Sequence, residues 1–337
     1  METVPPAAVD ERDLIAALVA TWALEADGVR YLPKGFGSYH WVVHTRGRPK
    51  YFIAVDDLET KPWIASGHDA TFEGLTDAYR TASSLRDQAG LDLVVAPLPG
   101  RDGRVTLRLS SRYSMAVFPF VEGRTGNWGD PMTPDSRSRL LRELAMLHLA
   151  TPQAGSRTLK RPFELPERPG LRAALGALDR PWTGGPLSEP ARRALADHAG
   201  SVEARLAAFD DLAKLMEESA DDPVITHGEP HPGNFMHTEH GLRLIDWDTV
   251  ALAMPERDLW MLDDGSPGGF ALYSRLTGRT LSRAAISFYR QAWTLSDIAS
   301  FADMFRSDHS RTGWIEQKWR GFLQLLGGAP PCPYVAG

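Results

Sequence analysis

Apolar residues in the first third of the chain follow two spacings, one typical of helices and one typical of strands. Residues 10–26 carry apolar side chains every three or four positions, which predicts an amphipathic helix. Runs rich in β-branched and aromatic residues predict strands at 29–32, 39–44, 50–55, 91–96, 104–109 and 113–118. A second helical pattern covers 69–89. This part of the chain is therefore expected to form a small mixed β-sheet accompanied by one long helix.

The rest of the chain is dominated by the helical spacing. Amphipathic helices are predicted at 133–150, 171–178, 188 onward, 201–218, 281–305 and 314–326. The stretch 151–185 is rich in proline and glycine, and two short strand-like runs occur at 224–226 and 242–246. A chain of 337 residues exceeds one comfortable core, so we expect an α+β fold with two domains.

Each of the two short strands in the helical part leads into a cluster of polar residues. The first is followed by His227-Gly228-Glu229-Pro230-His231-Pro232-Gly233-Asn234, and the second leads into Ile245-Asp246-Trp247-Asp248. Phosphoryl transfer requires a carboxylate near the attacking hydroxyl, together with an amide oxygen and a second carboxylate that hold Mg²⁺. The five-residue step from Glu229 to Asn234, with an aspartate on the next strand, matches the spacing of the kinase catalytic loop.

This match predicts a role for each polar side chain of the motif. Glu229 is expected to accept the proton of the substrate hydroxyl or to orient that hydroxyl. Asn234 and Asp246 are expected to hold Mg²⁺ that bridges the nucleotide's phosphates. The histidines, His227 and His231, are expected to shape the loop through hydrogen bonds. Asp248 is either a secondary metal ligand or a structural hydrogen-bond acceptor.

The N-terminal part offers backbone groups that could bind a nucleotide. The turn between the first two predicted strands contains Gly35, Gly37 and Ser38. Glycine lets backbone amides approach phosphates closely, so this turn could cover them. The last predicted strand leads into an extended segment made of Pro119, Phe120 and Val121. Because proline has no N–H, the expected contacts with a nucleobase are the Pro119 carbonyl and the Val121 N–H.

A kinase also needs a lysine that binds the α- and β-phosphates, and in kinases the third strand carries it. The expected position holds Ala54 in this chain. The preferred substitute is Lys61, a few residues further on, and the alternatives are Lys34 and Lys50. Candidates for the acidic partner of this lysine, expected on the helix at 69–89, are Glu73 and Asp77.

Composition and charge narrow the class of protein without identifying the reaction. The chain is 43% hydrophobic and 24% charged, as in ordinary soluble globular proteins. Its net charge of −6 and the lack of a long basic run argue against nucleic acid as a partner. The single cysteine is Cys332, no apolar run approaches membrane-spanning length, and the N-terminus lacks a signal-peptide pattern. We expect a cytoplasmic protein without a membrane partner, as a monomer or homodimer.

Other chemistries fit the motif residues less well. Zinc could in principle be bound by His227, His231, His237 and Asp246, but the sequence lacks a helical His-x-x-x-His or a cysteine pair that would support such a site. Hydrolysis by a Ser-His-Asp triad lacks its Gly-x-Ser-x-Gly turn. A purely structural role would leave the kinase-like spacing unexplained.

The motif pair resembles that of the aminoglycoside phosphotransferase family, His-Gly-Asp-x-His-x-x-Asn followed by an aspartate-containing strand. The order of predicted elements is compatible with this family along nearly the whole chain. The resemblance implies a two-lobed protein-kinase-like fold, with a nucleotide-binding lobe at 1–120 that contains the small mixed β-sheet. The mainly helical lobe at 121–337 would be catalytic and would bind the substrate.

The same resemblance implies an antibiotic kinase. Such an enzyme uses ATP or GTP with Mg²⁺ to phosphorylate a hydroxyl, and so confers resistance or self-resistance. Within the family the chain resembles the spectinomycin-phosphotransferase-like group, and related enzymes act on nucleoside antibiotics such as capuramycin. Two positions depart from the family pattern: the catalytic aspartate is Glu229, one methylene longer, and the strand lysine is Ala54. Since Asn234 and Asp246 are intact, we expect an active enzyme rather than a degenerate kinase.

The acceptor is the least defined part of this prediction. The side chains of Asp258, Asp263 and Asp264 would suit the ammonium groups of an aminocyclitol. Aromatic residues such as Trp182 and Trp293 would suit a flatter, nucleoside-like ligand. Three alternatives stay open: a metabolic kinase of the same fold acting on choline or a sugar, a nucleotide-binding module without catalysis, and a metallohydrolase built on the histidines.

Overall fold

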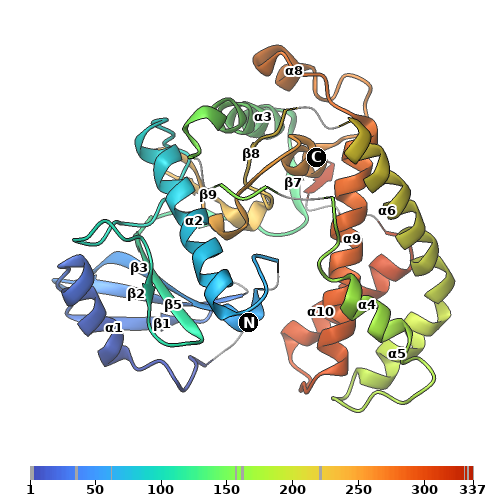
Figure 1. Ribbon diagram of the computed structural model, residues 1–337, viewed down its shortest axis with the longest axis horizontal. Helices are drawn as coiled ribbons and strands as arrows, with labels where there is room; N and C mark the ends of the chain where they lie inside the picture. The colour runs from blue at the N-terminus through green and yellow to red at the C-terminus, as the bar shows by residue number, and fades with distance from the viewer. Residues whose placement is uncertain are drawn as a thin grey trace. The chain divides into compact units, whose positions relative to one another are not determined.

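The computed structural model describes residues 4–34, 37–61, 63–155, 158–160, 163–219, 222–329, 331 and 334–336 (Figure 1). Two compact units divide the chain between them, and each is assembled from three separate stretches. Unit 1 consists of Met1–Asp130, Arg142–Lys160 and Val224–Ala253. Unit 2 consists of Pro131–Leu141, Arg161–Pro223 and Met254–Gly337. The residues of the predicted phosphotransfer motif therefore belong to the same unit as the N-terminal sheet.

The main sheet of unit 1 has five strands. Their spatial order is β1 (Gly28–Leu32), β2 (Ser38–Thr45), β3 (Arg48–Asp57), β5 (Tyr113–Pro119) and β4 (Leu107–Arg108). Every neighbouring pair is antiparallel, so the sheet is not mixed as the sequence suggested. Short hairpin connections between β1, β2 and β3 allow this arrangement without any crossover.

The two faces of this sheet are covered by different helices. Side chains alternate along a strand, so Ile53 and Val55 of β3 point to one face. There they pack with apolar residues of α1 (Glu11–Ala17) and of the π-helical turn Leu18–Trp22. On the other face, Ala116 of β5 packs with α2 (His68–Asp87), and Ala116 lies opposite Ala54 in the ladder. Ala54 and, two residues on, Asp56 consequently lie on the α2 face of β3.

A second group of short strands in unit 1 carries the polar motifs. Strand β8 (Val224–Thr226) is buried along its length and pairs with β11 (Ala251–Ala253). Strand β9 (Phe235–Thr238) lies between β10 (Gly241–Leu244) and β6 (Arg124–Thr125). The motif loops start from the ends of these strands, which fixes where their polar side chains are presented.

Unit 2 is mainly helical (Figure 1), and its apolar core is formed by side chains of α9 together with those of neighbouring helices such as α6 and α10. Its helices are α4 (Arg168–Leu175), α5 (Ser188–Asp197), α6 (Ala199–Ser219), α7 (Glu256–Leu259), α8 (Ala271–Thr277), α9 (Arg283–Arg306) and α10 (Gly313–Leu326). Phe288 of α9 stacks on Phe209 of α6 with ring centroids 4.9 Å apart, and Phe305 meets Phe322 of α10 at 5.7 Å. Helix α3 (Pro134–Leu149) contributes to both units. The remaining short strands are β7 (Asp130–Met132) and β12 (Tyr334–Ala336).

The predicted α+β class and the long helices are confirmed, whereas one predicted strand is wrong and another is shorter than predicted. Residues 91–96 form a single parallel bridge, Val94 to Leu244, instead of a strand. The backbone of this segment instead forms hydrogen bonds with β10. The Leu244 N–H donates to the Leu93 carbonyl, and the Val95 N–H donates to the Leu244 carbonyl. At 104–109 only Leu107–Arg108 is a strand. The domain boundary at 120/121 stays a prediction, and the compact units interleave across it.

No helix in the described part of the chain is long and apolar enough to cross a membrane.

In unit 2, the surroundings of the Asp297 carboxylate disfavour its charged form. Burial raises the pKa of Asp297, on α9, to about 6 from 3.8, and Glu167 adds to the rise. Attraction to Lys318 and a hydrogen bond from Trp293 oppose it. Between about pH 4 and pH 6 the folded state therefore binds more protons than the unfolded state, so this group's contribution to stability falls as pH rises through that range.

We predict that Asp297→Asn stabilises the protein at neutral pH, because the amide keeps the shape and avoids burying a charge. The free energy of unfolding at pH 7.5 should rise by up to about 3 kcal/mol. At pH 4.5 the difference should fall to about 1 kcal/mol, because the carboxyl is then mostly protonated in the folded state but still mostly ionised in the unfolded state. Denaturant unfolding at both pH values measures it, with Asp211→Asn at an exposed position of α6 as the control. A variant that is less stable at pH 7.5 would contradict the prediction.

Candidate active site

The loop after β8 closes on itself through backbone hydrogen bonds. The His231 N–H donates to the Glu229 carbonyl at 2.8 Å, and the Asn234 N–H donates to the His231 carbonyl at 2.9 Å. The Asn234 side-chain amide also donates to the Glu229 carbonyl, at 3.0 Å. Gly228 begins the turn with φ +99°, a conformation that favours glycine. The amide oxygen of Asn234 is consequently the side-chain atom that can bind a cation.

His227 joins this loop to the turn that carries Asp246. Its Nδ1 accepts the Glu229 N–H at 3.2 Å, so the ring proton lies on Nε2, which is 2.9 Å from the Ile245 carbonyl. The His227 carbonyl accepts the Thr249 hydroxyl at 2.7 Å. The buried imidazole therefore has the bracing role predicted from the sequence, and it fixes the distance between the two motifs.

Asp246 lies at the turn after β10 in an unusual backbone conformation. Its φ of +68° and ψ of 67° are left-handed, which costs a residue other than glycine about 1 kcal/mol. The next residue, Trp247, is fully buried, donates its indole N–H to the Leu244 carbonyl at 2.8 Å and meets the His227 ring edge-on. The packing of Trp247 offsets the strain and holds the Asp246 carboxylate in place.

The charges around Asp246 do not balance. Burial raises the pKa of Asp246 well above its ordinary value, and the nearby carboxylates of Asp248, Glu229 and Asp56 raise it further. Lys61 is the cation that opposes them. A divalent cation bound here would relieve this repulsion. One carboxylate and one amide oxygen, completed by phosphate oxygens, are a donor set that Mg²⁺ prefers.

Lys61 is the lysine that the fold brings to this cluster. Its amine lies 2.7 Å from Asp248 Oδ2 and 3.1 Å from Asp56 Oδ1, and the residue is 1% exposed. The two alternatives, Lys34 and Lys50, are exposed. Burial alone would lower the pKa of Lys61, but the attraction of Asp248 and Asp56 outweighs burial and raises it.

The glycine turn before β2 reaches the same cluster. The Ser38 hydroxyl donates to Asp56 Oδ1 at 2.6 Å, and a Cβ at Gly37 would lie 3.8 Å from the Lys61 amine. Gly37 has φ +84°, which favours glycine. Gly35 lies outside the described residues. Segments 38–61 and 229–248 are distant in sequence, yet they meet within one unit at these side chains.

The predicted base-contacting segment follows β5. Pro119 is the last residue of β5, opposite Tyr51 of β3. The Phe120 N–H donates to the Lys50 carbonyl at 3.0 Å, so that donor is used by the fold itself. The Pro119 carbonyl and the Val121 N–H stay the predicted contacts with a nucleobase.

His231 is expected to be neutral at physiological pH. Burial lowers its pKa to about 4, and the neighbouring His227 adds to this effect. Its Nε2 lies 3.9 Å from Glu229 Oε2, which is too long for a hydrogen bond. Its ring lies 6.0 Å from that of Trp128. His231 therefore lines the site next to Glu229 without contributing a charge.

The zinc hypothesis loses its basis in the structure. Within the part of the chain that the structure describes, no group of three or more His, Cys, Asp or Glu residues is arranged to hold a metal. Both nitrogens of His227 are engaged by backbone groups, and His237 is exposed on β9.

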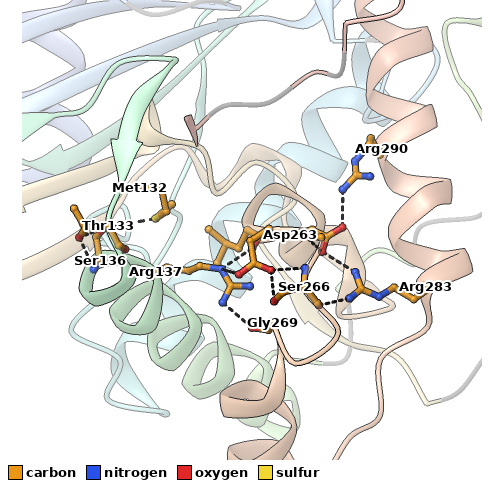
Figure 2. Close-up of polar contacts among 12 residues, drawn as sticks. Met132, Thr133, Ser136, Arg137, Asp263, Ser266, Gly269, Arg283 and Arg290 are labelled. Carbon is orange, nitrogen blue, oxygen red and sulfur yellow. Dashed lines mark hydrogen bonds and ion pairs between the residues drawn. The ribbon is translucent and has the colours of Figure 1, made fainter. Parts of the chain in front are cut away.

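The three acids proposed to recognise ammonium groups belong to unit 2, where two of them already contact cations. Both oxygens of Asp263 are paired, one with Arg283 at 2.7 Å and the other with Arg290 at 2.8 Å (Figure 2). Asp264 accepts the Ser266 hydroxyl at 2.7 Å and lies 3.5 Å from Arg137. Asp258 is fully buried. An ammonium group would have to compete with these arginines, so the role of these acids stays a prediction.

Asp56 and Tyr79 belong to the cluster around Lys61, and neither was predicted from the sequence as a site residue. Asp56 is bound by Ser38 and Lys61, and the hydroxyl of Tyr79 on α2 donates to its other oxygen at 3.2 Å. The helix acids expected in this role lie elsewhere: Glu73 is exposed, and Asp77 pairs with Arg80. The available signal was the acidic pair 56–57 at the end of an otherwise apolar strand.

Comparison with known proteins identifies the family to which this chain belongs. The sequence model of the phosphotransferase enzyme family matches residues 32–264. Protein StrN of Streptomyces griseus is 28% identical over 317 residues, which cover 90% of this chain and 87% of that protein.

Two solved structures share the fold. A spectinomycin phosphotransferase in complex with ADP and spectinomycin has a TM-score of 0.73 at 16% identity, covering 95% of this chain and 98% of that one. Choline kinase LicA from Streptococcus pneumoniae has a TM-score of 0.58 at 15% identity, covering 94% and 98%. Because the family model spans well over half of the chain and includes both motifs, the protein belongs to the phosphotransferase enzyme family.

Proposed function

We propose that this phosphotransferase moves the γ-phosphoryl group of ATP or GTP, with Mg²⁺, onto a hydroxyl of a small-molecule antibiotic. The antibiotic is of the aminoglycoside, aminocyclitol or nucleoside type, and the reaction confers resistance or self-resistance. The observation that carries this proposal is the cluster of Asp248, Asp56 and Asp246 around the buried amine of Lys61, with the Glu229 carboxylate near Asp246. Such an excess of carboxylates, next to a glycine turn, suits a metal–triphosphate complex.

Each residue of the cluster has its own role in the proposed reaction. The Glu229 carboxylate accepts the proton of the substrate hydroxyl or orients that hydroxyl toward the phosphorus atom. Asn234 and Asp246 would hold the metal, which would supply positive charge opposite the phosphate oxygens. Gly37, Ser38 and Lys61 would hold the phosphates. His227 and the Asn234 amide keep the loop rigid, so that little reorganisation is needed at the moment of transfer.

The class of acceptor rests on relatives and is the finer part of the proposal. The likeness to a spectinomycin phosphotransferase supports an antibiotic that carries an aminocyclitol. The choline kinase has the same fold, so a metabolic kinase is the alternative. A panel of antibiotics together with choline and sugars, offered with ATP or GTP and Mg²⁺, distinguishes the two. Nucleotide binding with no product from any acceptor would favour a module without catalysis.

We predict that Glu229→Gln and Asp246→Asn remove most of the activity while the fold is kept. Each substitution replaces a carboxylate by an amide of the same shape, so only the charge is lost. Loss of the group that handles the proton should lower kcat about 10²- to 10⁴-fold, and loss of a metal ligand should have an effect of at least similar size. Glu239→Gln, at an exposed position near β9, is the matched control. Unchanged turnover in Asp246→Asn would refute the proposed reaction site.

Asn234→Ala is predicted to raise the Mg²⁺ concentration needed for activity. The amide oxygen supplies one of the two protein ligands, so the metal should bind about 10-fold more weakly or worse. The measurement is the Mg²⁺ concentration at half-maximal rate with saturating nucleotide. His237→Ala, exposed on the adjacent strand β9, should leave it unchanged. An unchanged Mg²⁺ requirement in Asn234→Ala would show that this side chain is not a ligand.

A further inference from the structure

Asp248, one of the acids around Lys61, could have either of two roles. Asp248 follows the metal-binding Asp246 by two residues, so it could bind the metal as well or could serve the lysine instead. Its Oδ2 atom lies 2.7 Å from the Lys61 amine, the shorter of that amine's two ion pairs. Lys61 and Asp56 are almost fully buried, so neither can reach an alternative partner in solvent.

At the position of β3 where a kinase would carry its lysine, this chain has Ala54. Ala54 lies between His40 and Ala116 in the ladder, on the α2 face of β3. Because side chains alternate, the next residue on that face is Asp56, a carboxylate where the strand would otherwise carry a cation. A positive charge on this face must therefore come from a residue outside β3.

The turn after β3 delivers that charge in a fixed geometry. The 3₁₀ turn Leu58–Thr60 ends directly before Lys61. Asp57 caps this turn by accepting the Glu59 N–H at 3.1 Å, and Arg112 binds both oxygens of Asp57 at 2.9 Å and 2.6 Å. Leu58 is buried, and its N–H donates to the Arg112 carbonyl. These contacts restrict the backbone from which Lys61 projects into the cluster.

Asp56 is itself held from three directions. The Ser38 hydroxyl and the Lys61 amine contact Oδ1, at 2.6 Å and 3.1 Å, and the Tyr79 hydroxyl donates to Oδ2 at 3.2 Å. The α2 residue that contacts Asp56 is thus a hydrogen-bond donor, Tyr79, and not the acid expected there. An acid from α2 is unnecessary, because Asp56 and Asp248 already supply two.

An ammonium group has three N–H donors. Asp56 and Asp248 use two of them, so one donor can still reach a phosphate oxygen while both carboxylates remain in contact. The glycine turn marks the direction of approach, since a Cβ at Gly37 would lie 3.8 Å from the amine. The acids therefore orient the lysine without preventing it from binding an anion.

We propose that Asp56 and Asp248 are positioning residues for Lys61, and that Asp248 serves the phosphate-binding lysine rather than the metal. This inference rests on the proposed nucleotide-dependent function. Asp56 at the end of β3 and Asp248 in the turn after Asp246 then have the role that was expected of the acids on α2, Glu73 and Asp77. It also implies that the phosphate-binding and metal-binding groups are joined through the two-residue link from Asp246 to Asp248.

Nucleotide binding without metal separates the two possible roles of Asp248. Affinity for ATP and for GTP is measured by calorimetry in EDTA, for the wild type and for Lys61→Met, Asp56→Asn and Asp248→Asn. Loss of a charge-assisted contact to phosphate should weaken binding by Lys61→Met about 10- to 100-fold. The two acid variants should weaken it by a smaller factor. Lys61→Met combined with Asp248→Asn should bind no more weakly than Lys61→Met alone, because the acid acts through the lysine.

Two controls define the contrast. Asp246→Asn should leave metal-free affinity unchanged or increase it, since it removes a negative charge near the phosphates. Lys50→Met, at an exposed position of β3, should have no effect. In the presence of Mg²⁺, Asp248→Asn should raise the KM for nucleotide while the Mg²⁺ concentration at half-maximal rate stays as in the wild type.

The opposite results would overturn the inference. If Asp248→Asn raises the Mg²⁺ requirement as Asp246→Asn does and leaves metal-free affinity unchanged, Asp248 is a metal ligand. Normal metal-free affinity in Lys61→Met would remove the lysine's role, while loss of activity in Asp246→Asn would still support the proposed reaction. Failure of the wild type to bind either nucleotide when Mg²⁺ is also present would refute the proposed function itself. Asp248→Asn preserves shape, so it carries the test if Lys61→Met does not fold.

Discussion

The structure of unit 1 depends on one electrostatic constraint, the presence of the Asp248, Asp56 and Asp246 carboxylates around the buried amine of Lys61. Loss of solvation of the Asp246 carboxylate, and after it the repulsion from Asp248 and Glu229, raise the pKa of Asp246. A buried charge without a partner destabilises a fold strongly, so the cluster persists only because Lys61 neutralises part of it and hydrogen bonds satisfy the rest. The remaining negative charge is what makes the cluster suitable for a metal and a triphosphate.

Much of the surrounding architecture serves to hold these side chains. The alternation of β3 buries Ile53 and Val55 on one face and turns Asp56 to the other. Trp247 fills the core beneath the Asp246 turn, and His227 ties that turn to the loop with Glu229 and Asn234. Apolar burial thus supplies the free energy that keeps several polar groups in strained or repulsive positions.

The sequence was sufficient for the long helices and for the motif loops, because helical periodicity and short-range spacing are local properties. It failed at residues 91–96, whose backbone pairs with Leu244, far away in sequence. It singled out Lys61 but expected the wrong partners for it, since nothing local indicates that Asp56 and Asp248 converge on one amine. The expected acids on α2 were plausible from helix position, yet Tyr79 occupies the contact. Long-range electrostatic pairing was the part that only the fold could supply.

The most direct test of this account is a crystal structure of the protein with Mg²⁺ and a non-hydrolysable analogue of ATP or GTP. We expect the metal on Asn234 and Asp246, and the Lys61 amine within hydrogen-bonding distance of a phosphate oxygen while still in contact with Asp56. A structure in which Lys34 or Lys50 binds the phosphates, or in which the metal lies away from Asp246, would contradict the account.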